Sequence, residues 1–308
     1  MPLIRSVLDY LIYLIVRLML CVIQSISMDT AVSMIKTLAW IVTYVIPVRR
    51  GVLKKNFDIA FPDLPQKKRL ELIYQMWEHL LLMGVEMAFT SRKIHPTNWR
   101  HYIKLVNTDK IGCFFHQERS LIMITAHFGN FEAGGYFLGT LGYPSYAVAR
   151  TLDNLYLDRF LKRFRESSGQ YLVPKNEGPD QIIEILERKD MVAFLADQSA
   201  GPKGCWVDFF GHPASAYKAM ALMSLKFDAP IIVCYTTRTE DTPLQFEIET
   251  AGILDPRNLP DNINNVKDIT QWFTSLLEDH IRKKPNQYWW LHDRWKTYGK
   301  VFPPKKAG

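Results

Sequence analysis

Apolar residues form one long run near the start of the chain. Residues 7–27 contain only two charges, Asp9 and Arg17, and a bilayer-crossing helix needs about 20 mostly apolar residues. Arg17 falls near the middle, where a charge costs roughly 2.5–3.5 kcal/mol on insertion scales. The run predicts a membrane-spanning helix or an anchor lying in the interface, with a buried hairpin of a soluble fold as the alternative.

A second apolar stretch, residues 37–48, is too short to span a bilayer and ends in a basic cluster. The cluster comprises Arg49, Arg50, Lys54 and Lys55. We expect these cations to hold the chain against an anionic cytoplasmic surface.

The remainder of the chain alternates between helical and strand-like patterns. Apolar positions recur at helical spacing in residues 65–90, and later helices are expected at 131–141, 154–168, 180–189, 217–227 and 266–284. Short apolar runs predict strands at 120–126, 146–149, 171–174, 191–196, 230–237 and 244–249. This alternation predicts an α/β fold with a mostly parallel central sheet flanked by helices, with chemistry beyond the carboxyl ends of the strands.

Charge and cysteine content narrow the partners and the compartment. The net charge of +7 favours a polyanion such as nucleic acid, anionic lipid or an acidic carrier. The basic residues are not gathered with aromatic residues and no nucleic-acid-binding motif is present, so we favour lipid over nucleic acid. The four cysteines are far apart, which indicates neither a disulfide framework nor a zinc site, and favours a reducing compartment.

The segment from His127 to Glu132, between a buried strand and a helix, is the strongest candidate for chemistry. An imidazole there can act as a general base, because its ordinary pKa is about 6.5. We expect the carboxylate of Glu132 to fold back and orient the ring. Gly129 permits an unusual backbone angle, and Asn130 is a natural cap for a helix whose exposed amides can bind an oxyanion. By itself, this spacing also fits a histidine that only satisfies backbone groups.

Five ordered blocks, covering nearly the whole chain, resemble the bacterial lipid A biosynthesis acyltransferases, the late acyltransferase family. The pair His127 and Glu132 also looks like the His-x4-acid motif of the glycerolipid acyltransferases. The blocks are residues 56–62, Arg150 with Asn154, Leu157, Asp158 and Gly169, Ala196-Asp197-Gln198, Phe209-Phe210-Gly211 with Pro213 and Ala214, and residues 285–296. The chain departs from the family with Asp293, where His-Arg-Arg-Trp is usual, and with Lys218, where a glycine is usual.

The resemblance implies an acyltransferase (EC 2.3.1) in which His127 takes the proton of an acceptor hydroxyl and Glu132 orients and charges the pair. The hydroxyl attacks an acyl thioester of acyl carrier protein or coenzyme A, with no cofactor, metal or covalent acyl-enzyme. The acceptor implied is a membrane glycolipid, first a lipid A precursor, with a phosphoinositol mannoside, an aminolipid or a lysophospholipid as alternatives. The implied organisation is a membrane anchor and interfacial helix at 1–50 and a catalytic domain at 51–308 on the cytoplasmic face of the inner membrane.

Further side chains are candidates for binding substrate, together with Asn130. Arg150 can pair with a phosphate, or form only a surface ion pair. Asp197 and Gln198 follow a buried strand and either bind substrate or cap a loop. Arg294, with His292, is expected to face a headgroup phosphate, and the basic helix 154–168 is either a solvated face or a docking surface for an acidic carrier.

Two other classes of function make different predictions. A hydrolase needs a serine elbow or a metal set, and the sequence contains neither Gly-x-Ser-x-Gly nor His-Glu-x-x-His. A non-catalytic membrane adaptor predicts that His127 tolerates substitution while lipid binding persists.

Overall fold

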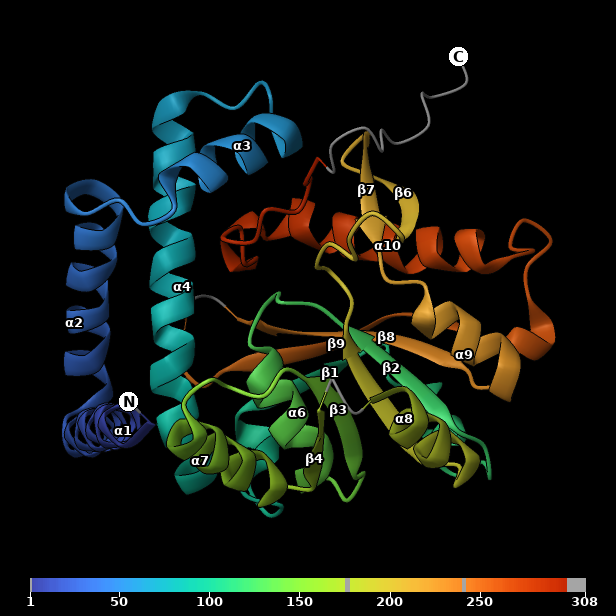
Figure 1. Ribbon diagram of the computed structural model, residues 1–308, viewed down its shortest axis with the longest axis horizontal. Coiled ribbons are helices and arrows are strands. Elements are labelled where there is room, and N and C mark those ends of the chain that lie inside the picture. The colour runs from blue at the N-terminus through green and yellow to red at the C-terminus, as the bar shows by residue number, and fades with distance from the viewer. Residues whose placement is uncertain (1, 175–177, 240–241, 298–308) are drawn as a thin grey trace.

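The computed structural model describes residues 2–174, 178–239 and 242–297. Its centre is a seven-stranded sheet in the order β1-β9-β8-β2-β5-β3-β4 (Figure 1), parallel throughout except between β8 and β9. The strands are β1 (Ile103–Val106), β2 (Leu121–Thr125), β3 (Ser145–Ala149), β4 (Gln170–Pro174), β5 (Met191–Leu195), β8 (Ile231–Arg238) and β9 (Phe246–Leu254). A separate antiparallel hairpin contains β6 (Cys205–Phe209) and β7 (His212–Ala216). The predicted α/β class with a mostly parallel sheet is confirmed.

Helices cover both faces of the sheet because its central strands are apolar on both sides. Ile122 of β2 is buried in a cluster with side chains of α8, α9 and α10, whereas its neighbour Met123 packs on the opposite face with Ile111 of α5. The bounds are α5 (Ile111–Phe115), α6 (Phe131–Thr140), α7 (Leu155–Glu166), α8 (Gly178–Glu187), α9 (Ala219–Phe227) and α10 (Val266–Lys283), with short turns η2 (Trp99–His101), η3 (Pro256–Asn258) and η4 (Pro285–Gln287). The predicted helices and strands are present with shifted ends.

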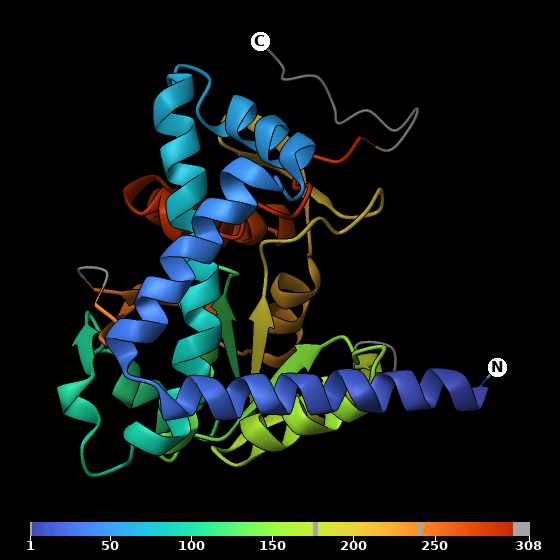
Figure 2. The ribbon, with the colours of Figure 1, turned by 90° about the vertical axis from the view of Figure 1, so that its left-hand side faces the viewer.

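The amino-terminal helices form an L-shaped arrangement beside the sheet. They are α1 (Pro2–Ser25), α2 (Met28–Trp40) continued by the π-helical turn η1 (Ile41–Val45), α3 (Arg50–Ala60) and α4 (Gln66–Lys93). Figure 2 shows α1 crossing the foot of α4 while α2 runs up beside α4. By length and composition α1 can cross a membrane over Ile4–Ser25, which agrees with the predicted amino-terminal anchor.

The basic cluster after η1 is used largely within the protein. The guanidinium of Arg49 donates to the carbonyl of Leu291 at 2.9 Å, and Lys55 pairs with Asp293 at 2.8 Å. Lys54 pairs with a carboxylate of its own helix, one turn away. These three cations were expected to hold the membrane surface, but two of them fix the closing segment of the chain. The Lys55 pair also gives Asp293, a departure from the family pattern, a structural role.

Candidate active site

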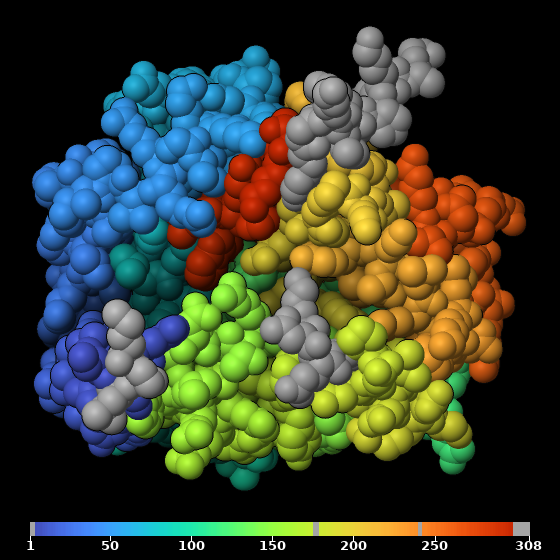
Figure 3. Space-filling model, in the orientation of Figure 1, coloured from blue at the N-terminus to red at the C-terminus, as the bar shows by residue number. Residues whose placement is uncertain are grey.

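Two polar side chains meet at the carboxyl edge of the sheet. His127 follows β2 and Asp197 follows β5, and these strands pair in parallel, with Thr125 beside Leu195 at their ends. The amide of Ala196 donates to the carbonyl of Thr125 at 3.0 Å, which extends the pairing to the edge. Parallel neighbours end on the same side of a sheet, so residues that are 70 positions apart become adjacent. Figure 3 shows the surface hollowed on this face, between the red closing segment and the green segment that follows β3.

The ring of His127 is held by Asp197. Its Nδ1 lies 2.8 Å from Oδ1 of Asp197, and the same oxygen accepts the backbone amide of His127 at 3.1 Å. Because a carboxylate can only accept, Nδ1 carries the proton and Nε2 keeps a lone pair. The side-chain amide nitrogen of Gln198 lies 3.5 Å from Nε2. The arrangement is that of a general base, with its acceptor nitrogen directed away from the buried carboxylate.

Burial and charge act in opposite directions on the pKa of His127. Burial of the ring lowers the pKa, but the charge and hydrogen bond of Asp197, with a smaller contribution from Glu132, outweigh burial and leave the pKa above 6.5. Burial likewise raises the pKa of Asp197, while His127 brings it below its ordinary value of 3.8. Asp197 is therefore ionised at neutral pH and stabilises the imidazolium that forms when His127 accepts a proton.

The side chain of Glu132 contacts an arginine of α7 and not the ring of His127. Its carboxylate forms a paired contact with Arg165 of α7, including a hydrogen bond of 3.0 Å from Nε of the arginine. The expectation that Glu132 folds back onto the imidazole is wrong in this geometry, because its position in the first turn of α6 points it towards α7. It acts on His127 only through its charge.

The turn from His127 to Asn130 is fixed from two sides. Gly129 has φ of 62°, and a Cβ there would lie 2.0 Å from the carbonyl oxygen of Thr236, so both the backbone angle and the close approach require glycine. The amide of Gly129 donates to the carbonyl of Gln287 at 2.9 Å, and the amide of Asn130 donates to Thr236 at 2.7 Å. Strand β8 and the closing segment therefore hold this turn between them, and the unusual backbone angle predicted for Gly129 is confirmed.

A buried polar network of α4 and β8 side chains also contacts this turn. Arg238 donates two hydrogen bonds of 2.7 Å to the carboxylate of Glu86, and a third of 2.8 Å to Nδ1 of His79. Since Arg238 can only donate, Nε2 of His79 carries the proton, which it donates to the carbonyl of Gly129 at 3.1 Å. Burial, followed by the charge of Arg238, lowers the pKa of His79 to about 3, so this histidine is neutral. Sequence reasoning missed this network, whose members lie on α4 and β8.

Asn130 is a structural residue. Its Oδ1 accepts the amide of Ala133 at 2.9 Å, and its Nδ2 donates to Glu86 at 2.8 Å. The predicted helix cap is confirmed, whereas the predicted contact with substrate is not compatible with a fully buried side chain whose oxygen and nitrogen both have protein partners. At this helix start, the amides of Phe131 and Glu132 have no partner among the described residues.

The two arginines expected to bind phosphate have opposite surroundings. Arg150, just beyond β3, is highly exposed and pairs with Asp153 at 3.1 Å. Such exposed pairs contribute little and can be exchanged for another anion. Arg294 is buried, donates to the carbonyl of Ser215 at 2.6 Å and lies over the ring of Phe209. The structure therefore places Arg150 where a ligand can reach it, and places Arg294 in the interior rather than facing a headgroup.

The closing segment, residues 285–296, is tied to the site by polar contacts. Nε2 of His292 accepts the amide of Ser199 at 3.0 Å, so His292 faces the loop after β5 rather than a headgroup. Burial, the largest effect, lowers its pKa. Asn56 of α3 donates to the carbonyls of Trp290 and His292 at 2.8 and 2.7 Å. In the part of the chain that the structure describes, no three His, Cys, Asp or Glu side chains are grouped as metal ligands would be.

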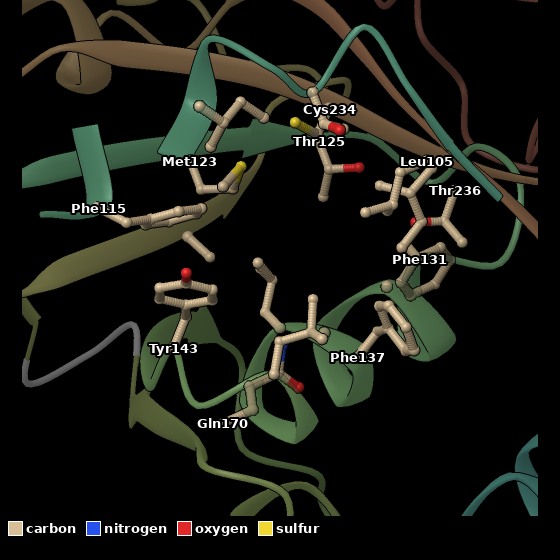
Figure 4. A pocket seen from close by; sticks show the side chains of 18 of the residues that line it. Leu105, Phe115, Met123, Thr125, Phe131, Phe137, Tyr143, Gln170, Cys234 and Thr236 are labelled. Atoms are coloured by element: carbon tan, nitrogen blue, oxygen red, sulfur yellow. The ribbon is translucent and has the colours of Figure 1, made fainter. Parts of the chain in front are cut away.

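An apolar cavity of about 370 Å³ lies between α6 and the sheet, next to this site (Figure 4). Figure 4 shows Phe115 and Tyr143 at one end and Phe131 and Thr236 at the other. The ring of Phe131 also contacts His127, with centroids 5.2 Å apart. The cavity is thus separated from the imidazole by one aromatic side chain and has the size of a site for a small apolar ligand.

Comparison with known proteins decides the class of enzyme. The model of the family described as bacterial lipid A biosynthesis acyltransferase matches residues 4–297. The chain belongs to this family. The predicted resemblance and enzyme class, an acyltransferase of EC 2.3.1, are confirmed.

Several curated relatives align over most of their length. The lipid A biosynthesis lauroyltransferase of Escherichia coli K12 is 21% identical over 262 residues, 83% of this chain and 82% of the relative. The lipid A biosynthesis palmitoleoyltransferase of the same strain is 24% identical over 254 residues, 81% and 79% of the two chains. The lipid A biosynthesis acyltransferase of Haemophilus influenzae is 24% identical over 262 residues, 81% and 78%. The crystal structure of the 1-acyl-sn-glycerophosphate acyltransferase PlsC from Thermotoga maritima aligns with a TM-score of 0.39 and 11% identity, covering 86% of this chain and 97% of that one.

Proposed function

We propose that this acyltransferase moves a fatty acyl group from a thioester of acyl carrier protein or coenzyme A to a hydroxyl of a membrane glycolipid, a lipid A precursor. The observation that carries the proposal is the His127–Asp197 pair at the carboxyl edge of the sheet, beside an apolar cavity, in a member of this family. Relatives named as lauroyl- and palmitoleoyltransferases of lipid A biosynthesis support the acceptor class.

The reaction follows from the free lone pair on His127. Nε2 takes the proton of the acceptor hydroxyl as its oxygen attacks the thioester carbonyl, and Asp197 stabilises the imidazolium. The carbonyl oxygen becomes an oxyanion, for which the amides of Phe131 and Glu132 are the nearest unpartnered donors of this turn among the described residues. The carbon–sulfur bond then breaks, and the leaving sulfur receives the proton from His127. The products are an ester and a free thiol.

Glu132 contributes to this site without touching the imidazole. Its negative charge adds to the stabilisation of the His127 imidazolium, and its contact with Arg165 ties α6 to α7. We propose that this ion pair holds the helix start, and therefore the oxyanion donors, in place. In this proposal Glu132 belongs to the catalytic centre, as expected from the sequence, but it positions the helix start and does not orient the imidazole ring.

The cavity beneath α6 is the proposed site of the acyl chain. Its lining is largely apolar, and its end nearest the imidazole is marked by Phe131. Burying each methylene stabilises the complex by about 0.8 kcal/mol, which favours chains that fill the space. We further propose that exposed Arg150 exchanges Asp153 for a phosphate of the acceptor or the donor.

The membrane arrangement is part of the same proposal. Residues 1–50 anchor the enzyme, and residues 51–308 form the catalytic domain on the cytoplasmic face of the inner membrane. The apolar α1 supports the anchor, and the four free cysteines fit a reducing compartment.

The test is transfer by the purified full-length protein. Labelled acyl carrier protein and acyl-CoA are each supplied with a lipid A precursor, a phosphoinositol mannoside, an aminolipid or a lysophospholipid, and products are identified by mass spectrometry. We expect ester formation on the lipid A precursor, its loss in His127→Ala, and its retention in the matched control His212→Ala, which changes an exposed histidine of β7.

Three outcomes would contradict parts of the proposal. Transfer to another acceptor alone replaces the acceptor while keeping the mechanism. Release of free fatty acid without any acceptor indicates a hydrolase. Full activity in His127→Ala rejects the mechanism itself.

A further inference from the structure

A second large groove lies away from the catalytic turn, between α1, α4 and α7. Its volume is about 720 Å³, and it is lined by side chains of all three helices. Its outer wall is the apolar amino-terminal helix, and its inner wall is α7, whose Arg165 reaches Glu132 on the side towards α6. Helix α7 thus lines the groove and, through Arg165, also contacts the helix start beside His127.

The lining of this groove combines cationic and apolar side chains. Arg17, Arg159 and Arg163 line it, and all three are exposed. Among the described residues that form the groove there is no carboxylate, and none of these three arginines belongs to an ion pair. Apolar and aromatic side chains such as Leu20 and Phe160 complete the walls. A lining that combines exposed guanidinium groups with apolar side chains suits a ligand with an anionic head and a hydrocarbon body.

Helix α1 is held against the domain along most of its length. The hydroxyl of Ser6 lies 3.3 Å from that of Tyr156, and Asn154 donates to the carbonyl of Asp9 at 2.8 Å. Near the other end, Gln24 donates to a carbonyl of α4 at 2.7 Å. A helix fixed in this way runs beside the domain, so lipid surrounding it has direct access to the groove.

The position of Arg17 explains why an arginine interrupts the apolar run. Its guanidinium lies 5.0 Å from the ring centroid of Phe160 and donates to the hydroxyl of Tyr13 at 3.2 Å. These contacts orient the charge towards α7 and leave other guanidinium donors available, because the group has five. An arginine at the centre of a helix surrounded by hydrocarbon is expensive, whereas one that faces a phosphate at the interface is not.

We propose that the groove between α1, α4 and α7 binds the phosphate headgroup of an anionic glycerophospholipid from the surrounding membrane, with α1 lying in the interface. The three arginines pair with the phosphate, and apolar side chains such as Leu20 and Phe160 contact the first part of the acyl chains. The site is distinct from the acyl cavity beneath α6, and its occupancy does not depend on the acceptor proposed for catalysis.

Lipid retention by the full-length protein tests this proposal. The protein is reconstituted in nanodiscs of phosphatidylcholine with graded phosphatidylglycerol, and native mass spectrometry counts the retained lipids of each kind. We expect a preference for phosphatidylglycerol that falls more than tenfold in the triple variant Arg17→Gln, Arg159→Gln, Arg163→Gln. Each basic residue at an anionic surface contributes about 1 kcal/mol, and 1.4 kcal/mol is tenfold.

A matched variant separates the groove from general charge. Arg5→Gln, Lys162→Gln and Arg188→Gln remove the same charge from positions outside the groove, and should lower the preference far less than the groove variant does. If circular dichroism shows that the triple variant is not folded, the single variant Arg163→Gln is tested instead. We expect it to lower the preference for phosphatidylglycerol several-fold. Inorganic phosphate at equal ionic strength should not displace the lipid, because it lacks the hydrocarbon body.

Other results overturn the proposal. Equal losses in the groove and control variants would indicate non-specific surface charge, and displacement by inorganic phosphate would indicate a simple anion site. A raised KM for acyl carrier protein with unchanged lipid retention would instead assign the groove to an acidic carrier protein. None of these readouts requires that the lipid A precursor be the acceptor, so failure here is distinguishable from failure of the proposed function.

Discussion

Replacement of Asp197 by asparagine tests which carboxylate orients His127, the proposed general base. Oδ1 of Asp197 accepts both the backbone amide and Nδ1 of His127. An asparagine can keep its oxygen in that place, so the substitution removes the charge with little change in shape. The companion variant Glu132→Gln removes a charge that contacts Arg165 rather than the ring.

The expected decrease in kcat of Asp197→Asn follows from the loss of a hydrogen bond to a charged group. Such bonds contribute roughly 1.5–3 kcal/mol, so kcat should fall about 10- to 150-fold if the ring keeps its orientation. If the amide turns its NH₂ group towards Nδ1, the tautomer is wrong, and the loss approaches the order of 10⁴ known from serine proteases. We therefore expect a decrease of at least tenfold.

The pH profile of kcat/KM distinguishes the two carboxylates. A general base acts when neutral, so activity falls as pH decreases through the pKa of His127, which lies above 6.5 in the native protein. Burial lowers this pKa and Asp197 raises it, so Asp197→Asn should move the acidic limb to lower pH. Glu132, a smaller contributor, should move it less.

The measurement is initial rates from pH 5 to 9 with saturating and limiting acyl donor, on variants whose folding is verified by circular dichroism. An unchanged rate and acidic limb in Asp197→Asn, together with a large shift in Glu132→Gln, would refute the assignment of Asp197. It would restore the pairing expected from the His-x4-acid spacing.

Three further predictions concern the cavity, the catalytic turn and the buried network. Ala193→Phe fills part of the cavity proposed for the acyl chain and should shift the preferred donor to shorter chains by at least tenfold in kcat/KM, which a panel of acyl donors of different length measures. Gly129→Ala places a Cβ against the carbonyl of Thr236 at φ of 62° and should lower the free energy of unfolding by more than about 1–2 kcal/mol in urea titrations; unchanged stability would contradict the tight turn. In the folded protein the pKa of His79 is about 3, whereas in the unfolded chain it is about 6.5. Between these two values only the unfolded chain binds the proton, so the free energy of unfolding should fall by up to roughly 4 kcal/mol as pH decreases from 6.5 towards 3. This pH-dependent loss of stability should be missing in His79→Gln, and if it persisted there, His79 would not be its source.

The central strands and long helices could be predicted because their signals are local. Strands β2 and β5 are almost entirely apolar, β8 begins with an apolar run, and α4 and α10 have apolar positions at helical spacing. Strand β1 and the hairpin of β6 and β7 were not predicted, because they are short and mix buried with accessible positions. Their strand conformation depends on pairing with partners distant in sequence.

By itself, the sequence determined the fold class from local patterns and the family from five ordered blocks. It also made His127 a candidate, because a buried strand, a histidine and a glycine follow one another in one short segment. The tertiary structure alone decided which carboxylate serves that histidine. Glu132 is five positions away but belongs to a helix start that directs it towards Arg165. Asp197 is 70 positions away, yet β2 and β5 are parallel neighbours, so their ends bring the two side chains within 2.8 Å. Strand order, rather than spacing along the chain, determines this contact.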